Sequence, residues 1–228
     1  MIAKIRQWLD GHDNDNRAVV CWLNGPAGYG KSALAQTIAE CYAAEGRLLG
    51  SFFFLRGAGE RSHISRLIPT LAYQISLSVP DVKPLLEKAL RDEPALLGVT
   101  VSLAHRLRRL IIEPIHLYTS RLSSSSEAAS SLMRKQIIVI DALDECDDKA
   151  EMADFIDVLL SGGAHLPFQI LFTSRVEEHI RKEFVRSEAQ FLCHLELEKF
   201  DARPDIHICF QRAFGRIYDR NWRIMQRI

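Results

Sequence analysis

The stretch "GPAGYGKS" at residues 25–32 carries the residue types that phosphate binding needs. It fits the pattern G-x-x-x-x-G-K-[ST], with Gly25, Gly30, Lys31 and Ser32 at the fixed places. Glycine lets backbone N–H groups turn inward and approach phosphate oxygens closely, and the lysine can reach the β- and γ-phosphates. The serine hydroxyl can hold Mg²⁺. The spacing therefore predicts a phosphate loop (Walker A) for a nucleoside triphosphate, ATP or GTP, with Mg²⁺.

The sequence on either side of this loop has the pattern that such a loop requires. The apolar run "AVVCWL" (18–23) predicts a buried strand before it, and residues 31–46 show a helical pattern after it. A helix that begins near Lys31 directs its positive dipole end at the bound anion. A glycine-rich turn with a surface lysine is the simpler alternative, which this context disfavours. We expect the nucleotide to contact Gly25, Pro26, Ala27, Gly28, Tyr29, Gly30, Lys31, Ser32 and Ala33.

A second group of reactive side chains follows another apolar run, in "QIIVIDALDECDD" at residues 136–148. A carboxylate at the carboxyl end of a parallel strand faces the crevice in which ligands bind. Asp141 is therefore expected to hold Mg²⁺ together with Ser32. Asp144 or Glu145 could orient and activate a water molecule for attack on the γ-phosphate. The stretch predicts a Walker B element with a catalytic acid.

The remaining acids of this stretch have simpler explanations. "DKAE" (148–151) fits a capping box, in which Glu151 reaches back to the first residue of a helix that Asp148 caps. Asp147 is expected to be solvated. Neither acid is therefore assigned to catalysis.

Arginine side chains near two further strand ends are weaker candidates. "FQILFTSR" (168–175) ends in Arg175, which could sense or stabilise the charge of the γ-phosphate. The alternative is a surface arginine that opens the following helix. Arg56 and Arg61 follow the strand predicted at 48–55 and could approach the nucleotide, but no motif supports either of them.

The apolar pattern predicts the elements that must position these groups. Continuous apolar runs bounded by turn residues indicate strands buried on both faces, and the segments between them have helical periodicity. The strands are expected at 18–23, 48–55, 136–140, 168–174 and 190–197, and the helices at 5–9, 31–46, 63–79, 81–97 and 101–118. Pro69 should kink or restart the third helix. This alternation predicts an α/β fold of three αβα layers around a five-stranded, mainly parallel sheet.

The predicted boundaries divide the chain into three parts. Residues 1–17 are expected to form an N-terminal helix and loop, and residues 18–200 the nucleotide-binding core. Residues 201–228 have an amphipathic helical pattern and are interpreted as the start of a helical domain that is cut off. The serine-rich stretch at 119–131 is predicted to be a loop.

The composition argues against several other classes of protein. The 29 basic and 29 acidic residues balance, which gives no support to nucleic-acid binding. No apolar run reaches the roughly 18–20 residues of a membrane-spanning helix, and the N-terminus lacks the apolar region of a signal peptide. The five cysteines are scattered, as expected for reduced thiols in a cytoplasmic protein. The basic stretch "HRLRRL" (105–110) is interpreted as the exposed face of a helix, and the histidines have no metal-binding spacing.

On these motifs the sequence resembles the NACHT domain of STAND-class P-loop NTPases, in particular the fungal and nephrocystin-3-like N-terminal types. The resemblance covers residues 1 to about 215, and its most specific part is the acidic pattern "DALDE". The matching segments are "LNGPAGYGKSALAQTIAE" (23–40), "FFFLRGAGERSHISRLIPTLAYQIS" (52–76), "IIVIDALDECDD" (137–148) and "FQILFTSR" (168–175). The family implies an AAA+-like P-loop NTPase fold and a switch that hydrolyses ATP or GTP slowly. It also implies homo-oligomerisation, and effector or repeat domains in full-length relatives.

The leading hypothesis is a nucleotide-binding module with slow Mg²⁺-dependent hydrolysis that acts as a signalling switch or oligomerisation domain. ATP is favoured over GTP, because the guanine-selecting NKxD motif is absent from the sequence. The alternative is a non-hydrolysing nucleotide-binding scaffold or a truncated regulatory fragment. A phosphotransferase would need an acceptor site and a lid, for which the sequence has no motif.

Overall fold

The computed structural model describes residues 1–10, 18–98, 100–122, 136–162, 166–186 and 192–201. The chain divides into two units, Met1–Leu197 and Glu198–Ile228. The predicted helical segment at 201–228 lies outside the described residues except for Asp201, as does most of the serine-rich stretch. The sheet and the helices around it belong to the first unit.

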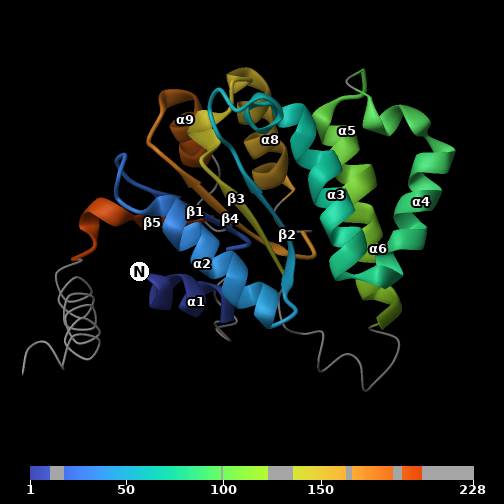
Figure 1. Ribbon diagram of the computed structural model, residues 1–228, viewed down its shortest axis with the longest axis horizontal. Helices are drawn as coiled ribbons and strands as arrows, with labels where there is room; N and C mark the ends of the chain where they lie inside the picture. The colour runs from blue at the N-terminus through green and yellow to red at the C-terminus, as the bar shows by residue number, and fades with distance from the viewer. Residues whose placement is uncertain (11–17, 99, 123–135, 163–165, 187–191, 202–228) are drawn as a thin grey trace, which may run out of the picture. The chain divides into compact units, whose positions relative to one another are not determined.

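A parallel sheet of five strands forms the centre of this unit (Figure 1). All of its strand pairs are parallel, and the order across the sheet is β2-β3-β4-β1-β5. The strands are β1 (Val20–Asn24), β2 (Leu48–Phe53), β3 (Ile137–Asp141), β4 (Gln169–Ser174) and β5 (Leu192–Glu196). Every residue of β1, β3 and β4 is buried, which explains their continuous apolar sequences.

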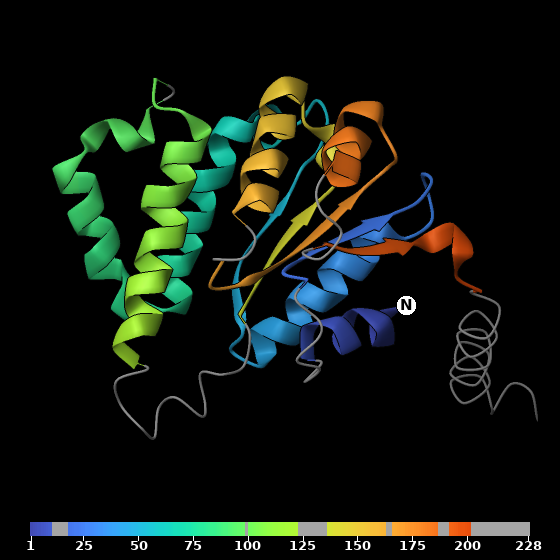
Figure 2. The ribbon, with the colours of Figure 1, turned by 180° about the vertical axis from the view of Figure 1, so that it is seen from behind.

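Helices cover both faces of the sheet, because alternate strand residues point to opposite sides. Ile137 and Val139 pack into the core shared with α1 (Ile2–Asp10) and α2 (Lys31–Ala44). Ile138 and Ile140 pack into the core shared with α8 (Lys149–Ser161) and α9 (Glu178–Arg186). Figures 1 and 2 show the two helix pairs on opposite sides of the sheet. The predicted α/β fold with αβα layers and a five-stranded parallel sheet, characteristic of P-loop NTPases, is therefore confirmed.

A group of helices lies beside strand β2, at one edge of the sheet (Figure 1). It consists of α3 (Leu67–Ser78), α4 (Lys83–Asp92), α5 (Leu103–Leu107) and α6 (Glu113–Leu122), with a π-helical turn at Arg108–Ile112 between the last two. Short 3₁₀ turns at Gly59–Ser62, Ile64–Arg66, Pro80–Val82 and Pro94–Leu97 separate the helices. Pro69 lies in the first turn of α3, where proline is tolerated, so the helix restarts ahead of it as predicted.

Helix α3 also satisfies the outer edge of β2. Gln74 Oε1 accepts a hydrogen bond from the backbone N–H of Ser51 at 2.6 Å, and the Ser78 hydroxyl donates to the carbonyl of Leu49 at 3.0 Å. These side chains occupy backbone groups that an edge strand otherwise exposes to other chains. Among the described helices, none is both long and apolar enough to cross a membrane.

The basic stretch 105–110 does not form a uniformly exposed face, and that interpretation is wrong for Arg106. The residue is buried, with 4% of its surface exposed, and donates to the carbonyl oxygens of Leu96 and Ser65, each at 3.0 Å. Arg108 stays exposed and pairs with Glu113. The two carbonyl acceptors offset the cost of burying the guanidinium. No sequence pattern predicts such long-range partners.

Candidate functional site

The loop after β1 has the backbone that its glycines allow. Gly30 has a φ of 82° and Gly28 a φ of 78°, in the left-handed region that residues with a side chain rarely adopt. Helix α2 then begins at Lys31. Gly25 is needed for a different reason, since a Cβ atom there would lie 2.9 Å from Cβ of Leu197. The loop conformation therefore depends on glycine at the predicted positions.

Lys31 curls back over this loop. Its Nζ donates hydrogen bonds to the carbonyl oxygens of Gly25 at 2.6 Å and Pro26 at 2.8 Å. Burial lowers the pKa of Lys31, and the negative charge of Asp144 opposes that shift. The ammonium group is thus held at the loop by the backbone that surrounds it.

Asp141, at the end of β3, is a buried carboxylate with hydroxyl partners. Thr173 Oγ1 donates to Asp141 Oδ1. Burial raises the pKa of Asp141, and the hydroxyl groups of Thr173 and Ser32 act in the opposite direction. Because Thr173 Oγ1 also accepts from the backbone N–H of Ala142 at 3.1 Å, it fixes the start of the acidic turn. Ala142 itself has a φ of 59°, unusual for a residue with a side chain.

Both carboxylate oxygens of Asp144 accept hydrogen bonds from Arg175. The backbone N–H of Arg175 donates to Oδ1 at 2.8 Å, and its Nε donates to Oδ2 at 2.6 Å. The Asp144 side chain is 3% exposed, whereas that of Arg175 is 40% exposed. The hydrogen bond that Arg175 donates to the Asp144 carboxylate raises the pKa of Arg175. Both carboxylate oxygens of Asp144 therefore already have donors.

Glu145 has a different environment. It is only partly buried, and its carboxylate makes one side-chain hydrogen bond within the described part of the chain, at 3.2 Å from the backbone N–H of Arg56. Arg56 also donates through Nη2 to the backbone carbonyl of Asp144 at 2.6 Å. No sequence pattern favoured Arg56 as a site residue, because its contacts join residues about ninety positions apart in the chain.

These side chains line a cavity of about 390 Å³ at the carboxyl ends of the strands. Its walls consist of Ala27, Gly28, Gly30, Lys31, Ser32, Ala33, Ala142, Asp144, Glu145 and Arg175. Asp141 is not part of this lining, although Ser32, which is, lowers its pKa. Gly25 and Pro26 contribute through their carbonyl groups, while Tyr29 is 55% exposed on the loop. The structure thus brings together most of the predicted site residues, and adds Ala142, Thr173 and Arg56.

The predicted capping box at Asp148 is wrong. Asp148 precedes α8 but makes no capping hydrogen bond with its side chain. Its Oδ2 instead accepts from the backbone N–H of Ile64 at 3.1 Å and lies 3.5 Å from Nδ1 of His63. The carboxylate of Asp148 therefore binds the distant segment at His63 and Ile64 in place of the first turn of α8. Asp147 is exposed, as predicted.

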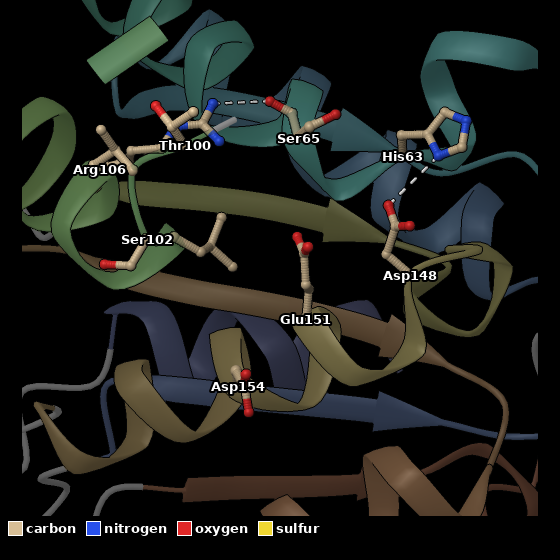
Figure 3. Close-up of a pocket in the computed structure, with 10 residues that line it drawn as sticks. His63, Ser65, Thr100, Ser102, Arg106, Asp148, Glu151 and Asp154 are labelled. Carbon is tan, nitrogen blue, oxygen red and sulfur yellow. Dashed lines mark hydrogen bonds and ion pairs between the residues drawn. The ribbon is translucent and has the colours of Figure 1, made fainter. Parts of the chain in front are cut away.

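Asp148 belongs to the wall of a second cavity, of about 540 Å³ (Figure 3). The cavity lies between the turn at Ile64–Arg66, α5 and α8, away from the phosphate loop. Its polar lining includes His63, Arg106 and Glu151, and Figure 3 shows the contact between His63 and Asp148 at one end. None of the residues predicted for the nucleotide site lines it.

Thr173 gives a test of the buried hydrogen bonds behind the site. Thr173→Val removes the hydroxyl and leaves both Asp141 and the N–H of Ala142 without that partner. We expect a loss of unfolding free energy on the order of 1–3 kcal/mol. Urea unfolding measures it, with Thr37→Val on the exposed face of α2 as the matched control, for which a change within about 0.5 kcal/mol is expected. A Thr173→Val protein as stable as the control would contradict this account.

Comparisons with known proteins bear on the family. The family model described as "Nephrocystin 3, N-terminal" matches residues 2–175. No curated protein matches the sequence. A solved structure, the cytoplasmic domain of the Thermomonospora curvata Type VII secretion ATPase EccC, is 17% identical with a TM-score of 0.42. The match covers 82% of this chain and 21% of that one, so the chain spans about a fifth of that protein's length.

Proposed function

The chain belongs to the nephrocystin 3 N-terminal family of NACHT-like P-loop NTPases, and on that premise we propose that it binds a nucleoside triphosphate and hydrolyses it slowly with Mg²⁺. Family membership supports a nucleotide-binding domain in general. The observation that carries the finer proposal is the convergence of Lys31, Ser32, Glu145 and Arg175 on one cavity. Crevices at the carboxyl ends of parallel strands are where ligands bind in such sheets.

The proposed binding uses the loop from Gly25 to Ala33. Backbone N–H groups at the start of α2 and the ammonium group of Lys31 would bind the phosphates. The oxygen donors fit Mg²⁺, because the Ser32 hydroxyl and the Asp141 carboxylate lie close enough for Ser32 to lower the pKa of Asp141. Bound there, Mg²⁺ would neutralise charge on the phosphate oxygens. Lys31 would exchange the carbonyl oxygens of Gly25 and Pro26 for phosphate oxygens.

Glu145 is the residue proposed to activate the attacking water. It lines the cavity and is only partly buried, whereas both oxygens of Asp144 already accept hydrogen bonds from Arg175. Glu145 would accept a proton from a water molecule aligned with the γ-phosphate. Asp144 would instead hold Arg175, whose exposed guanidinium can turn toward γ-phosphate charge. The two acids therefore have separate proposed roles.

The wider role proposed is that of a cytoplasmic signalling switch or oligomerisation domain of the STAND type, with ATP favoured over GTP. Residues 1–17, 18–200 and 201–228 are proposed as the N-terminal helix and loop, the core and the start of a helical domain. A non-hydrolysing scaffold is the second candidate. One observation favours it. Lys31 already bonds to the carbonyl of Gly25 and Arg175 to the carboxylate of Asp144, so both cations have partners without a nucleotide.

The test is single-turnover phosphate release by the purified chain with Mg²⁺–ATP and, separately, Mg²⁺–GTP. Lys31→Ala and wild-type protein in excess EDTA serve as blanks. Release above both blanks, faster with ATP, is the expected result. Tight binding without release would overturn hydrolysis and leave the scaffold, and no binding of either nucleotide would overturn both proposals.

A further inference from the structure

Arg56 connects the end of β2 to the turn that carries the two acids, and no motif or family match assigns it a role. We propose that Arg56 is a positioning residue for hydrolysis, which holds Glu145 in place to activate water. The inference rests on the proposed function and names a further residue that this reaction requires.

The register of the sheet brings Arg56 to the acidic turn. Strands β2 and β3 are parallel neighbours, and Phe53 pairs with Asp141. The backbone pairing continues one step further, since the N–H of Phe54 donates to the carbonyl of Asp141 at 3.1 Å. Arg56 and Asp144 each follow the paired residues by three positions. The segments that follow β2 and β3 therefore leave the sheet side by side, and the side chains that come next in each segment can meet.

The contacts of Arg56 fix both acids of the turn. Its Nη2 donates to the carbonyl of Asp144 at 2.6 Å, and its backbone N–H donates to the carboxylate of Glu145 at 3.2 Å. The guanidinium also lies 3.9 Å from a carboxylate oxygen of Glu177, two residues after Arg175. Arg56 thus touches the segments that follow β3 and β4 at once. This arrangement holds the Arg56 backbone close enough to Glu145 to orient its carboxylate.

The acidic turn that carries Asp144 and Glu145 needs contacts with other segments to hold its conformation. It begins at Ala142, whose φ of 59° is an unfavourable conformation for a residue with a side chain. Arg175 holds the Asp144 carboxylate, but within the described residues the Glu145 carboxylate has a hydrogen-bond donor only in Arg56. A catalytic base must keep hydrogen-bonding distance to its water, and small displacements of such groups cost large factors in rate. Loss of the Arg56 side chain should therefore affect turnover more than binding.

The same segment has a second attachment that does not involve the acids. The carbonyl of Ser62 accepts from the N–H of Asp147 at 2.9 Å, and Asp148 binds Ile64 and His63 at the end of the second cavity (Figure 3). These bonds keep the connection between β2 and α3 folded when Arg56 is changed. Arg61 lies within this connection, and its side chain makes no hydrogen bond or ion pair with the described residues. It is the matched control, because it shares the segment and the charge but not the contacts.

The experiment compares Arg56→Ala with Arg61→Ala in the full chain. Three quantities are measured for each variant: the melting temperature, the dissociation constant for Mg²⁺ with a non-hydrolysable ATP analogue, and the single-turnover rate with Mg²⁺–ATP. We expect Arg56→Ala to slow turnover at least tenfold and to change the dissociation constant less than threefold. Arg61→Ala should leave all three at the wild-type values.

A double-mutant cycle with Glu145→Gln separates positioning from a general structural effect. If Arg56 acts through Glu145, Arg56→Ala should slow wild-type turnover but cause no further loss in the Glu145→Gln background. Equal losses in the two backgrounds would overturn the inference, as would wild-type turnover by Arg56→Ala. A lower melting temperature with an unchanged rate would show a structural role only and would also overturn it. Wild-type protein that binds nucleotide without hydrolysing it would overturn the proposed hydrolysis and this inference together, a result distinct from the others.

Discussion

Lys31→Ala should weaken the binding of a nucleoside triphosphate by roughly 10- to 150-fold. The change removes a charge-assisted contact to the phosphates, worth on the order of 1.5–3 kcal/mol. The affected atom is Nζ, which the structure holds over the loop through the carbonyl oxygens of Gly25 and Pro26. Titration calorimetry with Mg²⁺ and a non-hydrolysable ATP analogue measures the change in the dissociation constant.

The control for this prediction is Lys88→Ala. Lys88 is exposed on α4, away from the cavity, so the substitution removes the same charge without touching the loop. Its dissociation constant should equal that of the wild type. If Lys31→Ala also bound as tightly as the wild type, the phosphate-loop assignment would have to be abandoned.

Much of the candidate site was predictable because it depends on short spacings. The phosphate loop needs glycine, lysine and serine within eight residues, and the structure places them at the start of α2. Asp141 and Arg175 were placed by the rule that strand ends meet at one edge of a parallel sheet. This rule predicted the side of the sheet on which the site lies, whereas the fold class followed from the alternation of apolar runs and helical segments.

The contacts that the sequence did not reveal depend on sheet order. Thr173 bonds to Asp141 because β3 and β4 are neighbours, and Arg56 reaches Asp144 because β2 and β3 are neighbours. Apolar runs identify strands but do not say which strands pair. Asp148 failed as a helix cap for a related reason, since the N–H of Ile64 competes for its carboxylate. Long-range partners thus decided the roles of side chains that local patterns could not assign.

Glu145→Gln should slow single-turnover hydrolysis by about 10²- to 10⁴-fold and leave nucleotide affinity unchanged. The substitution removes the group that accepts the proton from water, and general-base catalysis contributes about this factor. The fold should tolerate the change, because the amide oxygen of glutamine can still accept the hydrogen bond from Arg56. A change in unfolding free energy within about 0.5 kcal/mol is expected.

Asp144→Asn, in contrast, should lower the stability of the protein more than it slows hydrolysis. The amide presents an N–H group where both carboxylate oxygens accept hydrogen bonds from Arg175, so one of those bonds is lost together with the ion pair. We expect a loss of unfolding free energy on the order of 1–2 kcal/mol, because hydrogen bonds to charged groups are strong but the Arg175 side chain is 40% exposed to solvent. Below its melting temperature this variant should retain turnover better than Glu145→Gln.

Measured side by side, the two variants decide which acid activates the water. Urea unfolding and single-turnover phosphate release are needed for both, at a temperature where both are folded. Should Asp144→Asn abolish turnover while Glu145→Gln preserves it, the base is Asp144, and the ion pair with Arg175 must then open before the reaction. Since Asp144 and Glu145 are adjacent but only Asp144 is bound by an arginine side chain, the comparison isolates the effect of that contact on the chemistry.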